Sequence, residues 1–307
     1  MKSLNQLIIT LMVFLFSIQA WAQSGKLFNT DNQLSSNLAT QVFQDKSGFI
    51  WIATRNGLNT YDGYHITVMK KDMSNFLGLK SNYINSIAQD DKGHILLGTN
   101  NSLLEFTGSE FHKIPMLDSK GEELATYVKQ VYPLKNKDVA VATSGYGIMI
   151  KKKDAQECHA MKGEVEKLKY IHKRLEDKRG RLWIITEDGK LYRKETNGRV
   201  TSHFVGTEGV DAQDIQQDVL GNLYLASKNQ GVHLLRAGSN VFTRISSIGN
   251  LPIENIYISR NNKLYIGCDG LGIYVYDPQT GFLQDNPLFS RLVNLAKSKV
   301  TSIIEDN

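Results

Sequence analysis

A sequence unit that returns at intervals of 41 to 45 residues constrains this chain more than any other feature. The first copy, from Leu34 to Asp62, contains an apolar strand at Ala39–Phe43, a turn, and a second apolar strand at Phe49–Thr54. Copies aligned on the end of that second strand are separated by 45, 44, 43, 41 and 41 residues, at Thr54, Thr99, Thr143, Thr186, Ser227 and Cys268. So regular a period predicts a series of similar units, each packed on its neighbours.

The turn between the first two strands of the unit repeats as well. The sequence Asp45-Lys46-Ser47-Gly48 returns at 90–93, 177–180 and 218–221 as Asp-x-x-Gly. An aspartate accepts hydrogen bonds from turn amides, and a glycine takes the positive φ that such hairpins require. Copies three and six have Lys135–Asp138 and Arg260–Lys263 and lack the glycine. We therefore expect those two hairpins to use other turns.

The strand pattern and the period together predict the fold. The second strand, Phe49–Ala53, is apolar without alternation, which indicates that both of its faces are covered. Short strands that repeat every 40 to 50 residues or so are typical of a β-propeller, whereas a β-sandwich lacks matched turns at a fixed period. We predict an all-β protein, a β-propeller of four-stranded antiparallel blades with six complete repeats plus the start of a seventh.

The amino-terminal residues have the pattern of a secretory signal. Lys2 precedes an apolar run, Leu7–Phe16, and an Ala-x-Ala sequence ends at Ala22. This pattern predicts a signal peptide over residues 1–22 that is cleaved after Ala22, and hence export to the periplasm. No later segment is long and apolar enough to span a membrane.

The carboxyl-terminal residues resemble the beginning of another repeat. Val300–Asn307 matches Ala39–Lys46, and the chain stops at the first hairpin turn of that unit. We therefore expect residues 23–307 to form a propeller that is incomplete at its C-terminus, in a fragment of a longer protein or the product of an interrupted reading frame.

The cysteines and the charge distribution limit the possible functions. Cys158 and Cys268 fall in blades that are not neighbours, so we expect both thiols to be free. The net charge is +5, with basic residues concentrated at Lys151–Lys153 and from Lys162 to Arg181. We interpret these residues as a solvated blade edge, where lysines discourage edge-to-edge pairing. Attraction to an anionic ligand such as an acidic polysaccharide is the alternative.

The sequence contains no recognisable catalytic or metal-binding motif. Its seven histidines are dispersed over the repeats, and there is neither a phosphate-binding glycine loop nor a nucleophile elbow. The repeated aspartates, Asp45, Asp90, Asp177 and Asp218, are interpreted as turn formers rather than calcium ligands. We predict no catalytic residue, no metal site and no cofactor.

The first copy identifies a family resemblance. The stretch Asp45–Gly63, DKSGFIWIATRNGLNTYDG, resembles the two-component regulator propeller repeat, and Leu34–Asn37 and Leu79–Asn82 match its Leu-Ser-x-Asn start. The resemblance implies the periplasmic sensor part of a Bacteroides-type hybrid two-component system. Such receptors detect glycans and continue into a membrane helix, a histidine kinase and a DNA-binding domain. Kinase activity is therefore expected only of a full-length form, in which homodimerisation is also expected.

A ligand site in a propeller is expected where loops converge on the central channel. The loops between second and third strands are polar and vary from copy to copy, as recognition requires. We expect candidate ligand contacts at Arg55, Asn100, Tyr146, Lys228 and Asp269.

The favoured hypothesis is a non-enzymatic sensor for a glycan or oligosaccharide, with no nucleic-acid binding by this chain. A periplasmic polysaccharide lyase or hydrolase is the first alternative, because propellers also host such enzymes. It would require clustered carboxylates or a His/Tyr/Arg group at the channel. A non-catalytic interaction scaffold is the second alternative.

Overall fold

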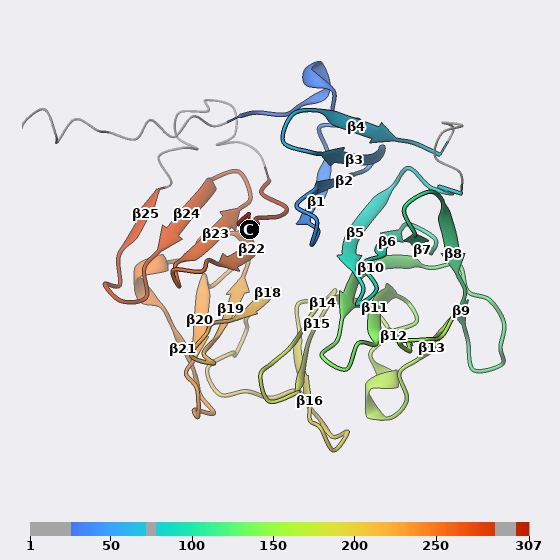
Figure 1. The fold of residues 1–307 in the computed structure, drawn as a ribbon. Coiled ribbons are helices and arrows are strands. Elements are labelled where there is room, and N and C mark those ends of the chain that lie inside the picture. The colour runs from blue at the N-terminus through green and yellow to red at the C-terminus, as the bar shows by residue number, and fades with distance from the viewer. Residues whose placement is uncertain (1–25, 72–77, 286–298, 307) are drawn as a thin grey trace, which may run out of the picture.

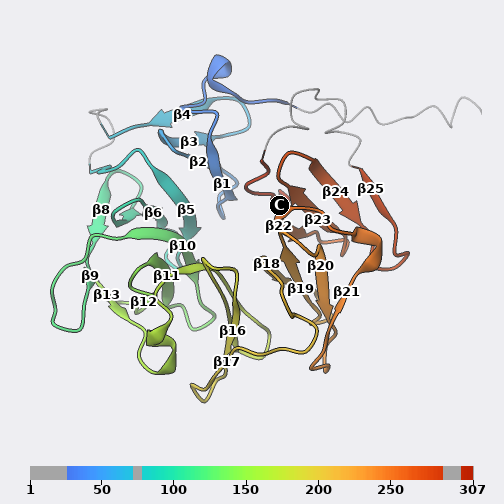
Figure 2. The same cartoon turned by 180° about the vertical axis from the view of Figure 1, so that it is seen from behind.

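The computed structural model describes residues 26–71, 78–285 and 299–306, and consists of six β-sheets arranged as blades around a central axis (Figures 1 and 2). Within each blade the strands follow one another antiparallel from the axis outwards. The predicted all-β propeller of four-stranded blades is confirmed. The predicted signal peptide, residues 1–22, lies outside the described residues.

The first three blades occupy the amino-terminal half of the ring. Their strands are β1 (Ala39–Gln44), β2 (Ile50–Thr54), β3 (Gly57–Tyr61) and β4 (Ile66–Met69); β5 (Ile84–Gln89), β6 (Ile95–Thr99), β7 (Leu103–Phe106) and β8 (Phe111–Ile114); and β10 (Tyr127–Pro133), β11 (Val139–Ser144), β12 (Ile148–Lys151) and β13 (Cys158–Ala160). The short strand β9 (Met116–Leu117) adds to the third sheet, parallel to β13.

The other three blades complete the ring. Their strands are β14 (Ile171–Glu176), β15 (Leu182–Thr186), β16 (Leu191–Lys194) and β17 (Val200–Thr201); β18 (Ala212–Gln217), β19 (Leu223–Ser227), β20 (Val232–Leu235) and β21 (Phe242–Arg244); and β22 (Ile253–Ile258), β23 (Leu264–Cys268), β24 (Gly272–Tyr276) and β25 (Leu283–Asp285). The only helical turns among the described residues are short 3-10 segments: η1 (Thr30–Asn32), η2 (Glu164–Lys167) and η3 (Ser246–Ile248). None of the helices in this part of the chain could cross a membrane.

The core lies between neighbouring blades. One cluster joins the first two blades, where Trp51 and Leu58 pack with Ile87, Leu97 and Phe111. The second strands are covered on both faces, and every residue of β6 is buried. Burial on both faces explains why these strands are apolar without alternation.

The hairpin turns of copies three and six differ from the prediction. The expectation that they use other turns is wrong: Lys137 and Asn262 adopt the left-handed conformation at φ 68° and 60°. The Lys137 amide donates to the Leu134 carbonyl at 2.9 Å, as the Gly48 amide donates to the Asp45 carbonyl at 3.0 Å in the first blade. A non-glycine residue therefore makes the same turn, at some conformational cost.

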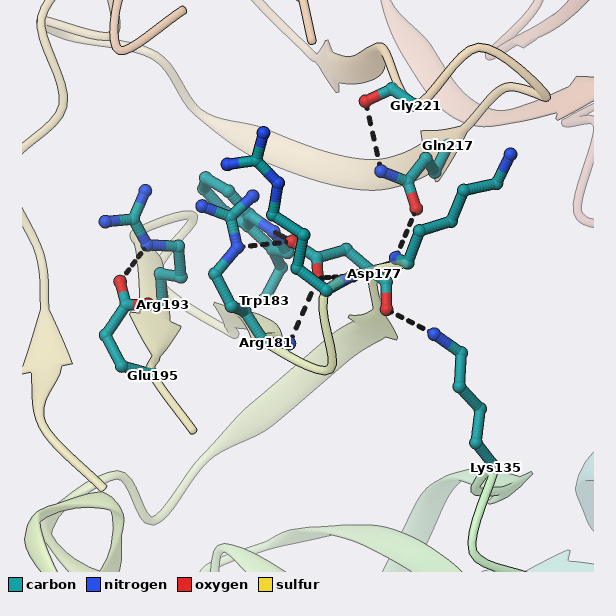
Figure 3. A network of polar contacts seen from close by, with 10 residues as sticks. Lys135, Asp177, Arg181, Trp183, Arg193, Glu195, Gln217 and Gly221 are labelled. Carbon is teal, nitrogen blue, oxygen red and sulfur yellow. Dashed lines mark hydrogen bonds and ion pairs between the residues drawn. The ribbon is translucent and has the colours of Figure 1, made fainter. Parts of the chain in front are cut away.

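The repeated aspartates form the turns, as predicted. Asp177 Oδ1 accepts from the amides of Arg179 and Arg181 at 2.9 and 3.0 Å. Its Oδ2 accepts from Trp183 Nε1 at 2.9 Å and from Arg181 Nε at 2.7 Å (Figure 3). The main-chain carbonyl of Asp177 also accepts from Lys135 Nζ, at 2.6 Å, so the same residue connects two blades.

Polar side chains connect each inner strand to the next around the ring. The Val131 amide donates to Ser86 Oγ at 3.0 Å, and the Ile256 amide donates to Asp214 Oδ2 at 3.1 Å. The same position of the repeat supplies Gln41, Ser86, Gln130, Asp214, Asn255 and Ser302, and in the fourth blade Lys173, which reaches the fifth blade through an ion pair with Asp214. Because Ser302 accepts from the Val42 amide at 3.3 Å, these contacts continue through the carboxyl-terminal segment back to the first blade.

Residues 299–306 lie at the innermost position between the sixth and first blades. Thr301 Oγ1 donates to the Ala39 carbonyl at 3.0 Å, as Thr40 Oγ1 donates to the Ile84 carbonyl at 2.6 Å. Val300 packs so closely on Gly267 that a Cβ there would lie 2.7 Å from Val300 Cγ1. The segment thus occupies the place of an inner strand, where its similarity to the repeat predicts one.

Both cysteines are buried and free, as predicted. Burial raises the pKa of each thiol to about 12. Neither thiol is therefore a thiolate nucleophile near neutral pH.

Candidate functional site

A cavity of about 590 Å³ follows the axis of the ring. All six inner strands, β1, β5, β10, β14, β18 and β22, line it together with Lys299 and residues 301–304. A volume between about 300 and 1,000 Å³ is usual for small-molecule sites. The axis is therefore the part of the molecule where side chains from every blade can reach one ligand.

A β-bulge in each inner strand contributes to the polar lining of the cavity. The ladder between the first and second strands skips one residue near its start in all six blades. The skipped residues are Thr40, Asn85, Lys129, His172, Gln213 and Glu254, and all except Gln213 line the cavity. A bulge frees its extra residue from strand pairing and re-aims its side chain, which here brings polar groups to the axis.

Two tyrosines and an arginine form an aromatic and cationic group at the cavity. The Tyr83 and Tyr127 rings meet edge to face with centroids 6.1 Å apart, and the Arg55 guanidinium lies 5.6 Å from the Tyr83 ring. The Tyr127 hydroxyl donates to Asn85 Oδ1 at 2.8 Å. Burial, followed by the neighbouring Tyr83, raises the pKa of Tyr127, so its hydroxyl stays neutral and able to donate.

Pairs of opposite charges contribute to the lining, although Glu187, one of the residues involved, lies outside it. Lys173 Nζ lies 3.7 Å from Asp214 Oδ2, and Lys299 Nζ lies 2.6 Å from Glu254 Oε2. Lys129 likewise pairs with Glu187 at 3.2 Å. These side chains present both donors and acceptors to the axis, which suits a polar ligand with many hydroxyl groups.

The site strongly affects the protonation of the bulge residue His172. Burial, together with the adjacent Lys173 and Lys129, lowers the pKa of His172 to about 4. Its imidazole is therefore neutral at neutral pH and can either donate or accept a hydrogen bond.

The five loop residues predicted to contact a ligand differ in their position relative to the cavity. Arg55 lines the cavity. Lys228 is exposed and reaches the site indirectly, with its Nζ 3.9 Å from the cavity-lining Glu254. Asn100, Tyr146 and Asp269 are exposed and lie outside the lining; Asn100 accepts a hydrogen bond from Ser81 Oγ at 2.8 Å. The loops thus contribute one direct residue, and the five do not form one group.

Sequence reasoning missed the bulge residues and the two tyrosines. The signal of the bulge residues was a variable polar residue directly after an apolar residue near the start of each inner strand, as in Ile84-Asn85 and Ile171-His172. The alignment on the second strand drew attention to the following loops and away from this position.

Only one group of residues in the described part of the chain could hold a metal ion, and it lies outside the cavity. Asp90, His94 and Glu105 place three ligand atoms within 4.8 Å of one another in the second blade. None of the three lines the axial cavity.

Comparison with known proteins agrees with this architecture. A family model described as two component regulator propeller matches residues 33–56 and 78–101. No curated protein sequence matches the chain.

Solved structures share the fold at low sequence identity. The extracellular domain assigned to a hybrid two component system of B. thetaiotaomicron superposes with a TM-score of 0.76 at 23% identity, over 92% of this chain and 39% of that one. A second such domain gives 0.71 at 17% identity, over 88% and 38%. This chain therefore spans about two fifths of their length. Virginiamycin B lyase from Staphylococcus aureus gives 0.65 at 13% identity, over 86% and 88%.

Proposed function

Since the chain carries two component regulator propeller repeats, we propose that it is the ligand-sensing propeller of a hybrid two component receptor. It works in the periplasm and binds a glycan or oligosaccharide. The observation that supports this function most directly is the axial cavity, which has the volume of a small-molecule site and a lining contributed by every blade.

The lining has the chemistry that recognises sugars. Tyr83 and Tyr127 offer aromatic surface, Asn85 offers an amide, and the pairs Lys173–Asp214 and Lys299–Glu254 offer charged donors and acceptors. Sugar hydroxyls both donate and accept, so they can satisfy such mixed groups when water is displaced. A purely apolar or single-sign lining would favour other ligands.

Binding along the axis also suggests how a signal would arise. A ligand that contacts several inner strands favours one packing of the blades over another, and only such a difference in affinity can shift a conformational equilibrium. In a homodimeric receptor this bias would be relayed to a kinase outside the present chain.

The test is binding of a panel of oligosaccharides to the purified chain, measured by isothermal titration calorimetry. For a sugar that binds, Tyr83→Ala and Asn85→Ala should each weaken the affinity about tenfold, since each removes one stacking or hydrogen-bonding contact. Asn100→Ala is the matched control, because Asn100 is an exposed turn residue outside the cavity. If all three variants bind the sugar with the affinity of the wild type, the ligand lies elsewhere and the axial site is refuted.

An oligosaccharide that binds can also be used to test whether the chain is an enzyme or a sensor. Some propellers of similar fold are lyases, and His172 offers a neutral imidazole at the cavity. Products detected by mass spectrometry after incubation with a bound oligosaccharide, and abolished by His172→Gln, would replace the sensor by a lyase or hydrolase. We expect the sugar to be recovered intact.

A further inference from the structure

A second group of polar side chains lies in the second blade, apart from the axial cavity. Asp90 begins the turn after β5, His94 ends that turn, and Glu105 lies on β7. His94 Nδ1 is 3.3 Å from Glu105 Oε1 and 3.7 Å from Asp90 Oδ2. One ring nitrogen therefore faces two carboxylates from separate segments.

The equivalent aspartates of the sister blades have permanent side-chain donors for their second oxygen. Those donors are Trp51 Nε1 on Asp45 at 2.7 Å, Trp183 Nε1 and Arg181 Nε on Asp177 at 2.9 and 2.7 Å, and Asn222 Nδ2 on Asp218 at 2.8 Å. In the second blade the indole position holds Leu96, and His94 takes the place of Arg181 or Asn222.

Asp90 is left with an oxygen that lacks such a donor. Its Oδ1 accepts from the His94 amide at 2.8 Å and so forms the turn. Its Oδ2 receives no hydrogen bond from the described residues, although only 6% of Asp90 is exposed. Asp90 Oδ2 is not among the side-chain atoms that are fully shielded from solvent, so this oxygen, which has no protein donor, is open to a cation that enters from outside.

No lysine or arginine of the described residues forms an ion pair with Asp90 or Glu105. Lys46 Nζ, a nearby cation, contacts the main-chain carbonyl of Asp90 at 3.3 Å. Lys137 and Lys153 pair instead with Asp91, at 3.8 and 3.9 Å. The two carboxylates therefore have only the imidazole between them, and a neutral imidazole can donate its single N–H to one of them at a time.

We propose that Asp90, His94 and Glu105 bind a divalent transition-metal ion, with zinc as the best match. Zinc takes imidazole nitrogen and carboxylate oxygen at bond lengths near 2.0 to 2.2 Å, so tetrahedral ligand atoms lie about 3.4 Å apart. The separations of His94 Nδ1 from the two carboxylates, 3.3 and 3.7 Å, are close to this value, and all three ligand atoms lie within 4.8 Å of one another. The His94 side chain is 33% exposed, which leaves a path for the ion and a position for water.

A bound ion would connect the β5–β6 turn to β7 and replace the donor that the sister blades build from protein. Asp90 keeps its role in the turn, because the proposal uses only Oδ2. This site lies outside the axial cavity and is independent of the ligand proposed there.

The test is titration of the full chain with ZnCl2 by calorimetry in a non-chelating buffer. We expect one ion per chain, and an affinity at least about tenfold lower in both His94→Asn and Glu105→Gln. His94→Asn supplies the amide that Asn222 provides in the fifth blade, so the turn keeps a donor for Asp90. The far-UV circular dichroism spectrum of His94→Asn should therefore match that of the wild type. If it does not, Glu105→Gln still tests the site.

His112→Asn is the control, because His112 is an exposed histidine of the same blade, with Nε2 3.3 Å from Glu110. It should leave zinc affinity unchanged. Failure of the wild type to bind zinc at millimolar concentration would overturn the proposal. Equal zinc affinity in the wild type, His94→Asn and Glu105→Gln would also overturn it, and so would a loss of affinity in His112→Asn alone. Either result would mean that zinc binds only adventitiously at the surface.

Discussion

Replacing Asp177 by alanine removes one carboxylate that holds a turn, a buried indole and an arginine (Figure 3). Trp183 is 0% exposed, so its Nε1 would lose its acceptor where water cannot easily replace it. An unsatisfied buried donor costs about 1 to 3 kcal/mol, and the lost charged hydrogen bond from Arg181 adds roughly 1 kcal/mol. We expect the free energy of unfolding to fall by about 3 kcal/mol, measured by urea denaturation at neutral pH.

Asp45→Ala in the first blade is the matched control. Asp45 makes the same turn and accepts from Trp51 Nε1 at 2.7 Å, but Phe49 stands where the fourth blade has Arg181. Asp45→Ala should therefore lower the free energy of unfolding by about 1 kcal/mol less than Asp177→Ala does, because no arginine hydrogen bond is lost.

The indole contribution can be isolated with Trp183→Phe. In that background the cost of Asp177→Ala should shrink by about 1 to 3 kcal/mol, because no indole donor remains to be left unpaired. An unchanged cost, or a smaller cost for Asp177→Ala than for Asp45→Ala, would refute this account of the turn.

The carboxylate also makes the stability depend on pH. Burial by itself would raise the pKa of Asp177, but the hydrogen bonds from Trp183 and Arg181 outweigh burial and hold it below the ordinary value of 3.8. The ionised form is therefore favoured in the folded state. Its contribution is present above pH 4 or so and is lost as the pH falls through the folded-state pKa, and Asp177→Ala should lose that part of the acid dependence.

Three further substitutions test the ring, the turns and the cavity. Gly267→Ala would place its Cβ 2.7 Å from Val300 Cγ1 and 2.9 Å from Asn255 Oδ1, and should lower the free energy of unfolding by about 1 to 3 kcal/mol in thermal denaturation. Adding Val300→Ala should recover only part of this loss, because Asn255 still crowds the new Cβ; no loss would mean that residues 299–306 do not pack there in solution. Lys137→Gly should raise the free energy of unfolding, measured by urea denaturation, by up to about 1 kcal/mol, because glycine adopts a φ of 68° without strain. A less stable variant would contradict the strain at Lys137. The folded-state pKa of His172, about 4, lies below the ordinary 6.5, so the unfolded chain binds more protons between these values. Lowering the pH from 7 to 5 should therefore cost about 2 kcal/mol of stability that His172→Gln does not lose, and identical pH profiles would contradict the burial of this imidazole.

The fold could be predicted from the sequence because the repeat encodes it locally. Each Asp-x-x-Gly turn and each apolar second strand specifies one hairpin, and the period then places the hairpins around a ring. The prediction was wrong where it relied on residue type alone: Lys137 and Asn262 take a glycine conformation because the surrounding hairpin fixes the turn.

The candidate site was harder to predict because it depends on strand register. Asn85 and His172 line the cavity only because a bulge shifts the pairing by one residue. The only mark of the bulge in the sequence is a polar residue after an apolar one, a pattern that ordinary strands also have. Glu105 is similarly 11 residues from His94 along the chain, and pairing between β6 and β7 brings the two side chains together.

The bulges have a consequence for how such a protein can change. Each bulge residue is outside the ladder, so its side chain can be exchanged with little disturbance of the blade that carries it. One chain already holds threonine, asparagine, lysine, histidine, glutamine and glutamate at this position. Five of these positions line the axis, and Thr40 and Asn85 also hydrogen-bond to the next blade, so a substitution there changes both the surface of the cavity and the contact between two blades. A new chemical surface can therefore arise at the axis through single substitutions, one blade at a time.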